Sequence, residues 1–235
     1  MKKVIKISGI ILGIVLAAAL AIFIFVPGIF TYHKVKKEYQ YIDRTIGTFD
    51  GFDVDIPKNF VAHTNDGITV MGPENARHNS DLIPFKSDDL MVMVSVLDDE
   101  TYGYAFFNEY SKYSKKDYLH FFKKLGIDPP QTSYENVKML RNLTSKDCLK
   151  LRGKDKKIFL EYAESKEFSE KIEIISYYEK DGVKGFFTEM SSAGAKKMKY
   201  IYALWLFHKE KQYIVHAYSS DKETAMQILS TVEIE

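Results

Sequence analysis

An uncharged, apolar run near the N-terminus constrains this chain more than any other feature. Residues 7–30 contain no charged side chain, and a helix of that length is about 36 Å long, enough to span a hydrocarbon core of roughly 30 Å. Fifteen of these residues are Ile, Leu, Val or Phe, and together they favour insertion by roughly 5 to 9 kcal/mol. We therefore expect a short basic tail and a transmembrane anchor within residues 1–32.

A cleaved signal peptide is the alternative to an anchor. Four alanines between residues 17 and 21 form the A-x-A patterns that signal peptidases recognise. The apolar run continues for nine residues beyond Ala21, which is typical of a stop-transfer segment and not of a cleavage site. The sequence therefore favours the uncleaved anchor, and a mature N-terminus at residue 20 or 22 would contradict it.

The charges that flank the run bear on its orientation. Three lysines lie on each side of it, namely Lys2, Lys3 and Lys6, then Lys34, Lys36 and Lys37. This count is nearly a tie under the positive-inside rule, but long C-terminal domains are translocated largely regardless of charge. We expect a single-pass protein of the plasma membrane with an extracytoplasmic C-terminal domain.

The remaining composition limits the partners and the redox chemistry. Without those six lysines the chain has 27 basic and 32 acidic residues, a net charge of −5. An acidic domain is a poor candidate for phosphate-backbone binding, so we expect no nucleic-acid partner. Cys148 is the only cysteine, which excludes an intrachain disulfide, a cysteine-based metal site and a lipid on a cysteine at the end of the run.

After the anchor, the pattern predicts a juxtamembrane stalk over residues 33–48 and one domain over residues 49–235. The alternation of Phe52, Val54 and Ile56 predicts a half-buried strand. Asn65-Asp66-Gly67 predicts a hairpin, and residues 90–97 predict a strand that is apolar on both faces and therefore central.

The middle of the domain is predicted to be helical. Ser114 with Asp117 is a capping signature, and Gly126 ends an apolar face that contains Leu119. Thr132 and Ser133 are candidate caps of a second helix that carries Val137 and Leu140. Residues 144–170 fit a helix or a strand, so we leave them unassigned.

The last third predicts a meander of strands and a short helix. Asp181-Gly182 predicts a tight hairpin that pairs Glu179 with Lys184 and Tyr177 with Phe186. Strands are expected at 200–207 and 212–219, before a helix capped at Ser220. This order predicts an α+β fold, in which an antiparallel sheet is packed with helices.

The two ends of the domain carry a resemblance. GFDVDIPKNF and YIVHAYSSDKETAMQILSTVEI resemble the PsbP-like and Mog-type α/β sandwich superfamily, in the form of a bacterial membrane-anchored member. The resemblance implies a PsbP-like sandwich with a terminal strand and a non-enzymatic binding or assembly role.

A search for chemistry finds no catalytic, cofactor or metal motif. No histidine lies in a metal-ligand motif, although His208 and His216 fall on neighbouring predicted strands and are expected to lie near each other. No nucleophile elbow is present, Cys148 is expected to be buried, and Asp50, Asp53 and Asp55 lack the spacing of a calcium loop. Residues 191–197 are expected to form a hairpin loop and not a phosphate loop.

Aromatic residues are the one compositional excess. A dense cluster follows the third predicted strand and consists of Tyr102, Tyr104, Phe106, Phe107, Tyr110 and Tyr113. Burial against the first helix is one interpretation, and an exposed interaction patch is the other. We expect a membrane-tethered module that binds a protein or envelope partner without a cofactor. The alternative is an envelope enzyme that acts on glycan through residues scattered in the sequence.

Overall fold

The computed structural model describes residues 14–15, 21, 26–98, 112–170, 173–191 and 197–235. Most of the expected anchor lies outside these residues, and no helix within them is both long and apolar enough to cross a membrane. The chain divides into two compact units, each built from three separate segments. The helical unit comprises residues 1–44, 109–129 and 142–167, and the sheet unit comprises residues 45–108, 130–141 and 168–235.

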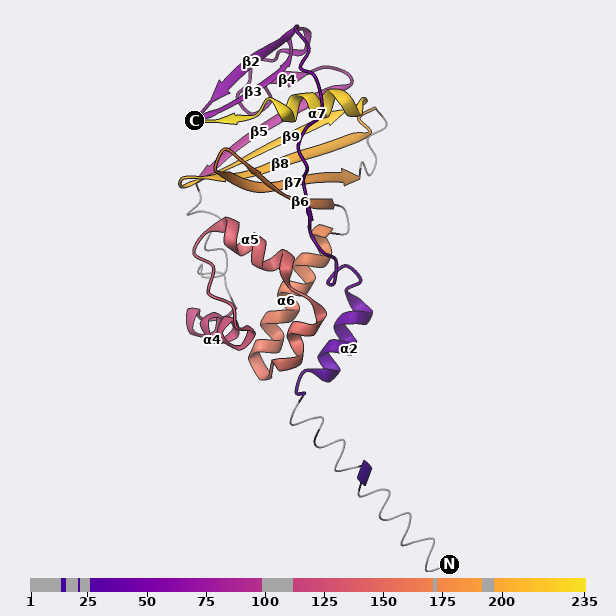
Figure 1. Cartoon of the computed structure of the whole chain (residues 1–235), viewed down its shortest axis with the longest axis vertical. Helices are drawn as coiled ribbons and strands as arrows, with labels where there is room; N and C mark the ends of the chain where they lie inside the picture. The colour runs from indigo at the N-terminus through magenta and orange to yellow at the C-terminus, as the bar shows by residue number, and fades with distance from the viewer. Residues whose placement is uncertain (1–13, 16–20, 22–25, 99–111, 171–172, 192–196) are drawn as a thin grey trace, which may run out of the picture. The chain divides into compact units, whose positions relative to one another are not determined.

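In the part of the chain that the structure describes, the helical unit contains three α-helices and one 3-10 helix (Figure 1). They are α2 (Ile29–Glu38), α4 (Lys115–Leu125), η2 (Ser145–Lys150) and α6 (Gly153–Glu170), whose last three residues pass beyond the unit. Residues 33–48, for which we expect a stalk, include most of α2. Val35 and Ile42 are 0% and 1% exposed, so this segment packs within the unit up to its end at residue 44.

Polar contacts explain why the expected stalk packs. Ser145 donates from its backbone N–H to Asp43 Oδ1 at 2.7 Å and from its hydroxyl to Asp43 Oδ2 at 2.8 Å. The ammonium group of Lys166, fully buried, donates to the carbonyl oxygens of Leu143 at 2.8 Å and Arg44 at 3.3 Å. The contacts of Asp43 with Ser145 and of Arg44 with Lys166 join segments that lie more than a hundred residues apart in the sequence.

The predicted limits of α4 are confirmed. Ser114 and Asp117 form a reciprocal capping box, and Gly126 ends the helix in the left-handed conformation at φ 74°. The predicted apolar face is wrong at one position, because Leu119 is 41% exposed. The buried face consists of Tyr118, Phe121, Phe122 and Leu125.

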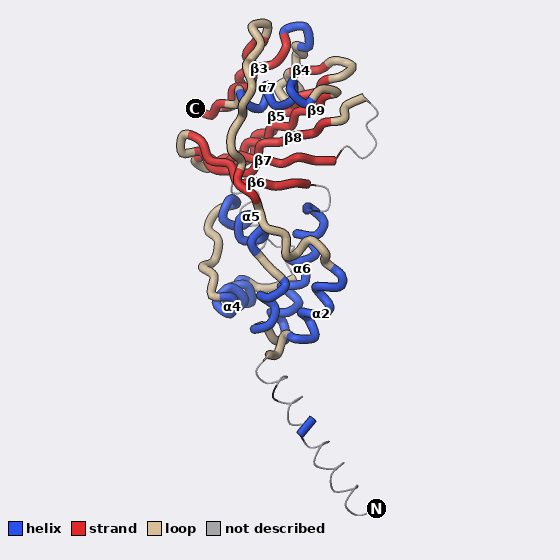
Figure 2. Tube along the Cα trace, turned by 45° about the vertical axis from the view of Figure 1, so that its right-hand side comes forward, coloured by secondary structure: helices blue, strands red, loops and turns tan. Residues whose placement is uncertain are grey.

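The sheet unit contains two sheets (Figure 2). The larger has the order β1-β6-β7-β8-β9-β5-β4, and the smaller has the order β10-β3-β2. Among the strands that the structure describes, only β1 and β6 pair in parallel. The strands are β1 (Gly47–Thr48), β2 (Phe60–Asn65), β3 (Ile68–Pro73), β4 (Phe85–Lys86), β5 (Leu90–Asp98), β6 (Glu173–Lys180), β7 (Val183–Ser191), β8 (Tyr200–His208), β9 (Lys211–Ser219) and β10 (Glu233–Ile234).

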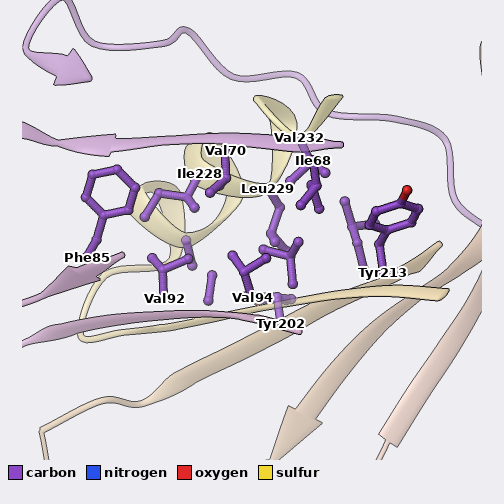
Figure 3. Packing of buried hydrophobic residues seen from close by; sticks show 14 of the residues in the cluster. Ile68, Val70, Phe85, Val92, Val94, Tyr202, Tyr213, Ile228, Leu229 and Val232 are labelled. Carbon is purple, nitrogen blue, oxygen red and sulfur yellow. The ribbon is translucent and has the colours of Figure 1, made fainter. Parts of the chain in front are cut away.

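The core of the sheet unit lies between the two sheets and includes α7 (Lys222–Ser230). Figure 3 shows Ile228 of α7 beside Val70 of β3 and Val92 of β5. The opposite face of the large sheet contacts α5 (Ser133–Asn142) through Tyr134, whose ring lies 5.5 Å from that of Phe186. The predicted α+β class is confirmed, since helices pack on both faces of a mainly antiparallel sheet.

The hairpin predictions are confirmed and several others are wrong. Asn65-Asp66-Gly67 joins β2 to β3, and Asp181-Gly182 joins β6 to β7 in the predicted register, with Glu179 opposite Lys184. In contrast, residues 52–56 form no strand, because Phe52 packs its ring against Phe49 at 4.8 Å and Phe187 at 6.1 Å.

Three further differences concern position and capping. β5 lies next to the two-residue edge strand β4, so residues 90–97 are not central. The helix α7 is capped by Asp221 and not by Ser220, because the Asp221 carboxylate accepts a hydrogen bond from the Thr224 N–H at 2.7 Å. In α5 the fully buried positions include Asn136 and Met139 instead of the predicted Val137 and Leu140, which are half-buried.

Candidate functional site

A cleft of about 900 Å³ lies within the helical unit. Its wall is formed by α4, by the segment from the end of η2 to the first turn of α6, and by Pro27. Five cationic side chains line it, and they are Lys116, Lys124, Lys150, Arg152 and Lys154. We define the cationic cleft by these five residues together with His120, Asp117 and Asp155.

The helix α4 directs three of these side chains into the cleft. Lys116, His120 and Lys124 follow one another at intervals of four residues, so they lie on the same face of the helix. The other face is anchored by the buried rings of Phe121 and Phe122. Because burial of the aromatic face fixes the rotation of α4, the basic face is held toward the cleft.

Both carboxylates of the cleft already have partners. Asp117 Oδ1 accepts a hydrogen bond from Lys154 Nζ at 2.9 Å, and its Oδ2 accepts from the Ser114 N–H at 3.0 Å. These hydrogen bonds, that from Lys154 first, lower the pKa of Asp117 to about 2. Asp155 is 7% exposed, and its Oδ1 lies 3.0 Å from His120 Nδ1.

Three of the five cationic side chains of the cleft have no acidic partner among the described residues. In the described parts of the chain, Lys116, Lys124 and Lys150 form no ion pair with an acidic residue, and all three side chains are exposed. A concave surface that gathers like charges concentrates their potential and attracts counter-ions. The arrangement is suited to binding an anion such as a phosphate or a carboxylate.

Among the residues that the structure describes, the lining of the cleft supplies no hydroxyl or thiol nucleophile. None of its lining residues is Ser, Thr or Cys. Cys148 lies nearby in η2, but it is 0% exposed and its thiol donates to the Ser145 carbonyl oxygen at 3.1 Å. Burial raises the pKa of this thiol to about 11, so it is protonated at neutral pH and inert. The burial predicted for Cys148 is confirmed.

Gly28 places the end of the apolar run at the cleft. Its N–H donates to the Leu149 carbonyl oxygen at 3.0 Å, and a Cβ at this position would lie 1.8 Å from the Cys148 carbonyl oxygen. Only glycine permits so close a backbone approach. The neighbouring Pro27 consequently lines the cationic cleft.

The two units carry opposite charge. The helical unit has 19 basic and 10 acidic residues, a net charge of +9, whereas the sheet unit has 14 basic and 22 acidic residues, a net charge of −8. The formal charge of +1 for the chain therefore conceals a strongly basic unit. The net charge of −5 obtained without the flanking lysines describes neither unit, because it sums the charges of both.

The predicted aromatic patch falls largely outside the described residues. Only Tyr113 is described; it is half-buried, and its ring lies 6.0 Å from that of Tyr118. The other five members lie in the range 99–111, which the structure does not describe. Residues 192–196 of the predicted loop are also outside the described residues.

The two histidines expected to lie near each other are separated along their strands. His208 pairs with Lys211 at the hairpin end, whereas His216 pairs with Ala203, five residues further along β8. Five residues of a strand span about 17 Å, so the two rings do not meet. Within the described residues, no group of three or more His, Cys, Asp or Glu side chains is arranged to hold a metal ion.

Comparison with known proteins does not assign the chain to a family. No protein-family model matches the sequence, and no curated protein is significantly similar to it.

Proposed function

We propose that this chain is a membrane-tethered, extracytoplasmic binding module whose cationic cleft holds an anionic group of its partner. The tether rests on the length and apolarity of residues 7–30. The binding role rests on the cleft, and the resemblance of the domain ends to a superfamily of binding and assembly modules agrees with it.

The convergence of five cations on one concave surface carries the proposal. Like charges held close together repel one another, and exposed lysines are free to diverge into solvent. In this unit the rotation of α4 and the first turn of α6 instead hold them around one volume. Because Asp117 and Asp155 are already engaged by Lys154 and His120, the three lysines without an ion pair remain to bind an anion.

A polyanion titration tests the binding role. The full chain, in nanodiscs of neutral phosphatidylcholine, is titrated with inositol hexakisphosphate, and the dissociation constant is measured by calorimetry. We expect the triple variant Lys116→Gln, Lys124→Gln, Lys150→Gln to bind at least tenfold more weakly, since each cation contributes to a charge-assisted contact.

The matched control removes the same charge from the sheet unit. Lys58, Lys86 and Lys222 are exposed there, and their replacement by Gln is expected to leave the affinity unchanged. Equal loss in the two triple variants, or no binding by the wild-type chain, would overturn the binding role.

The tether is tested separately. Alkaline carbonate extraction should leave the full chain with the membrane pellet, because insertion of an apolar helix survives the loss of surface contacts. Protease added to intact cells should digest the C-terminal units if they are extracytoplasmic. Release into the supernatant would refute the anchor, and protection would refute the orientation.

A second candidate function is an envelope enzyme in which His120 acts as a general base. The specific observation is the 3.0 Å contact between His120 Nδ1 and the buried Asp155, since a carboxylate that orients an imidazole is a recurring catalytic arrangement. In glycan cleavage by paired carboxylates, Asp117, with a pKa of about 2, could serve only as the ionised member of the pair and not as the general acid. Turnover of phosphodiester or glycan substrates that is lost in His120→Gln would establish this candidate.

A further inference from the structure

We infer that the anion held by the cationic cleft is the phosphate of an acidic phospholipid headgroup in the membrane that the chain enters. This inference rests on the proposed function and names the class of its ligand. Three observations carry it: the position of the cleft in the chain, the chemistry of its side chains and its size.

Position is fixed by covalent connection. Pro27 lines the cleft, and Gly28 is held against the backbone of η2 by its 3.0 Å hydrogen bond to Leu149. The uncharged run extends N-terminally from this point with no intervening polar linker. A span that ends near Pro27 therefore places the cleft at the level of the headgroups, a layer roughly 5 to 7 Å deep on each side of the hydrocarbon core.

Chemistry favours phosphate over other anions at that depth. Lysine ammonium groups bind phosphate oxygens as compact point charges, and Lys116, Lys124 and Lys150 line the cleft. Basic residues close to an anionic membrane surface each strengthen binding by roughly fivefold. At the level of the headgroups of an acidic lipid, the lipid phosphate is the anion present at the highest local concentration.

The size of the cleft is consistent with a headgroup. A volume of about 900 Å³ lies within the range of small-molecule sites. The cleft is thus suited to a single anionic headgroup.

Native mass spectrometry of the full chain in a mild non-ionic detergent tests the inference. The chain is titrated with phosphatidylglycerol or with phosphatidylcholine, and the fraction carrying bound lipid gives each dissociation constant. We expect phosphatidylglycerol to bind more tightly than phosphatidylcholine. The triple variant Lys116→Gln, Lys124→Gln, Lys150→Gln should weaken phosphatidylglycerol binding on the order of a hundredfold, as three fivefold effects combine.

Controls separate a lipid from a free phosphate and a local effect from net charge. The triple variant Lys58→Gln, Lys86→Gln, Lys222→Gln loses the same charge and should bind phosphatidylglycerol like the wild type. Glycerol 1-phosphate tests the headgroup without its acyl chains, and we expect it to bind far more weakly than the lipid.

The outcomes distinguish this inference from the proposed function. Equal affinity for the two lipids, equal loss in both triple variants, or glycerol 1-phosphate binding as tightly as the lipid would each overturn the lipid assignment. In the first and third cases, binding of inositol hexakisphosphate would still support an anion-binding cleft. Circular dichroism of each variant confirms folding; glutamine replaces lysine at little cost in helix propensity.

Discussion

The helical unit and the sheet unit differ in the side chains that are buried in their interiors. The core cluster of the sheet unit consists of aliphatic and aromatic side chains from both sheets and α7. Among the described residues, the helical unit buries two charged side chains, Lys166 and Asp155, which are 0% and 7% exposed, whereas the sheet unit buries one, Arg141, which is 5% exposed and lies outside that apolar cluster. The contrast shows that a basic unit can be held together partly by polar contacts between distant segments, which leaves other cations available at its surface.

The largest expected effect tests the apolar side of this contrast. Leu204 is fully buried in β8, and we expect Leu204→Ala to reduce the free energy of unfolding by about 2 to 5 kcal/mol because it leaves a cavity. Urea unfolding of the full chain measures the loss, and hydrogen exchange locates it in the sheet unit. The control Leu82→Ala, at a side chain 51% exposed, should cost less than about 0.5 kcal/mol. A loss as small as that of the control would contradict the assigned core.

A smaller effect is expected from the buried lysine of the helical unit. Lys166→Met preserves most of the side-chain volume but leaves the carbonyl oxygens of Leu143 and Arg44 without this donor. We expect a loss of about 1 to 3 kcal/mol, the cost of an unsatisfied buried polar group. Faster hydrogen exchange in α6 would report it, with Lys157→Met at an exposed position of the same helix as the control. Unchanged hydrogen exchange in Lys166→Met would contradict the difference between the two units, since apolar packing alone would then stabilise the helical unit.

The cap of α4 should contribute less. Ser114→Ala removes the hydroxyl that accepts from the Asp117 N–H at 3.3 Å, and loss of an N-cap costs about 1 kcal/mol. Exchange protection of the first turn of α4 is the measurement. Ser114→Thr keeps a hydroxyl that can accept from the Asp117 N–H and donate to the Asp117 carboxylate, so it should restore protection. Failure of this rescue would indicate that the hydroxyl does not act as the cap.

The smallest effect is a pH dependence confined to the sheet unit. Burial lowers the pKa of His216 from the ordinary value of 6.5. Above pH 6.5 the imidazole is neutral in both states. Below it, the unfolded chain takes up a proton before the folded chain does, so stability falls as pH decreases.

Unfolding free energies measured on both sides of pH 6.5 check this sign. His216→Gln should reduce the pH dependence of the sheet unit, whereas His208→Gln at the half-buried strand end should leave it unchanged. A pH dependence that persists in full in His216→Gln would assign it to other groups.

Local signals in the sequence predicted much of the fold. Asp181-Gly182 specifies both a turn and its register, and Ser114 with Gly126 specifies both ends of α4, because these signals act within a few residues. The strand predicted at 52–56 is wrong, because alternating apolar residues also occur in an extended segment that packs side chains such as Phe52 on aromatic rings and forms no backbone pairing with another strand. Residues 144–170 gave no clear pattern, since the buried positions of α6 include Asp155 and Lys166.

The candidate site was less predictable than the fold. The spacing of Lys116, His120 and Lys124 is visible in the sequence and indicates a basic face on α4. That this face lies in one cleft with Arg152 and Lys154 depends on α6, whose sequence pattern fits either a helix or a strand. The concentration of basic residues in the helical unit is likewise hidden in the net charge of the whole chain. Long-range contacts of this kind leave no periodic signal in the segments that make them.

The interlacing of the two units affects how the chain is made. Because each unit draws on three separate segments, the ribosome must release residue 167 before the helical unit has all of its parts, and the C-terminal strands of the sheet unit come later still. The segments that are synthesised early, including α2, therefore cannot complete their packing until the later segments have been synthesised. If the proposed tether is inserted first, the membrane holds the growing chain in place during that delay.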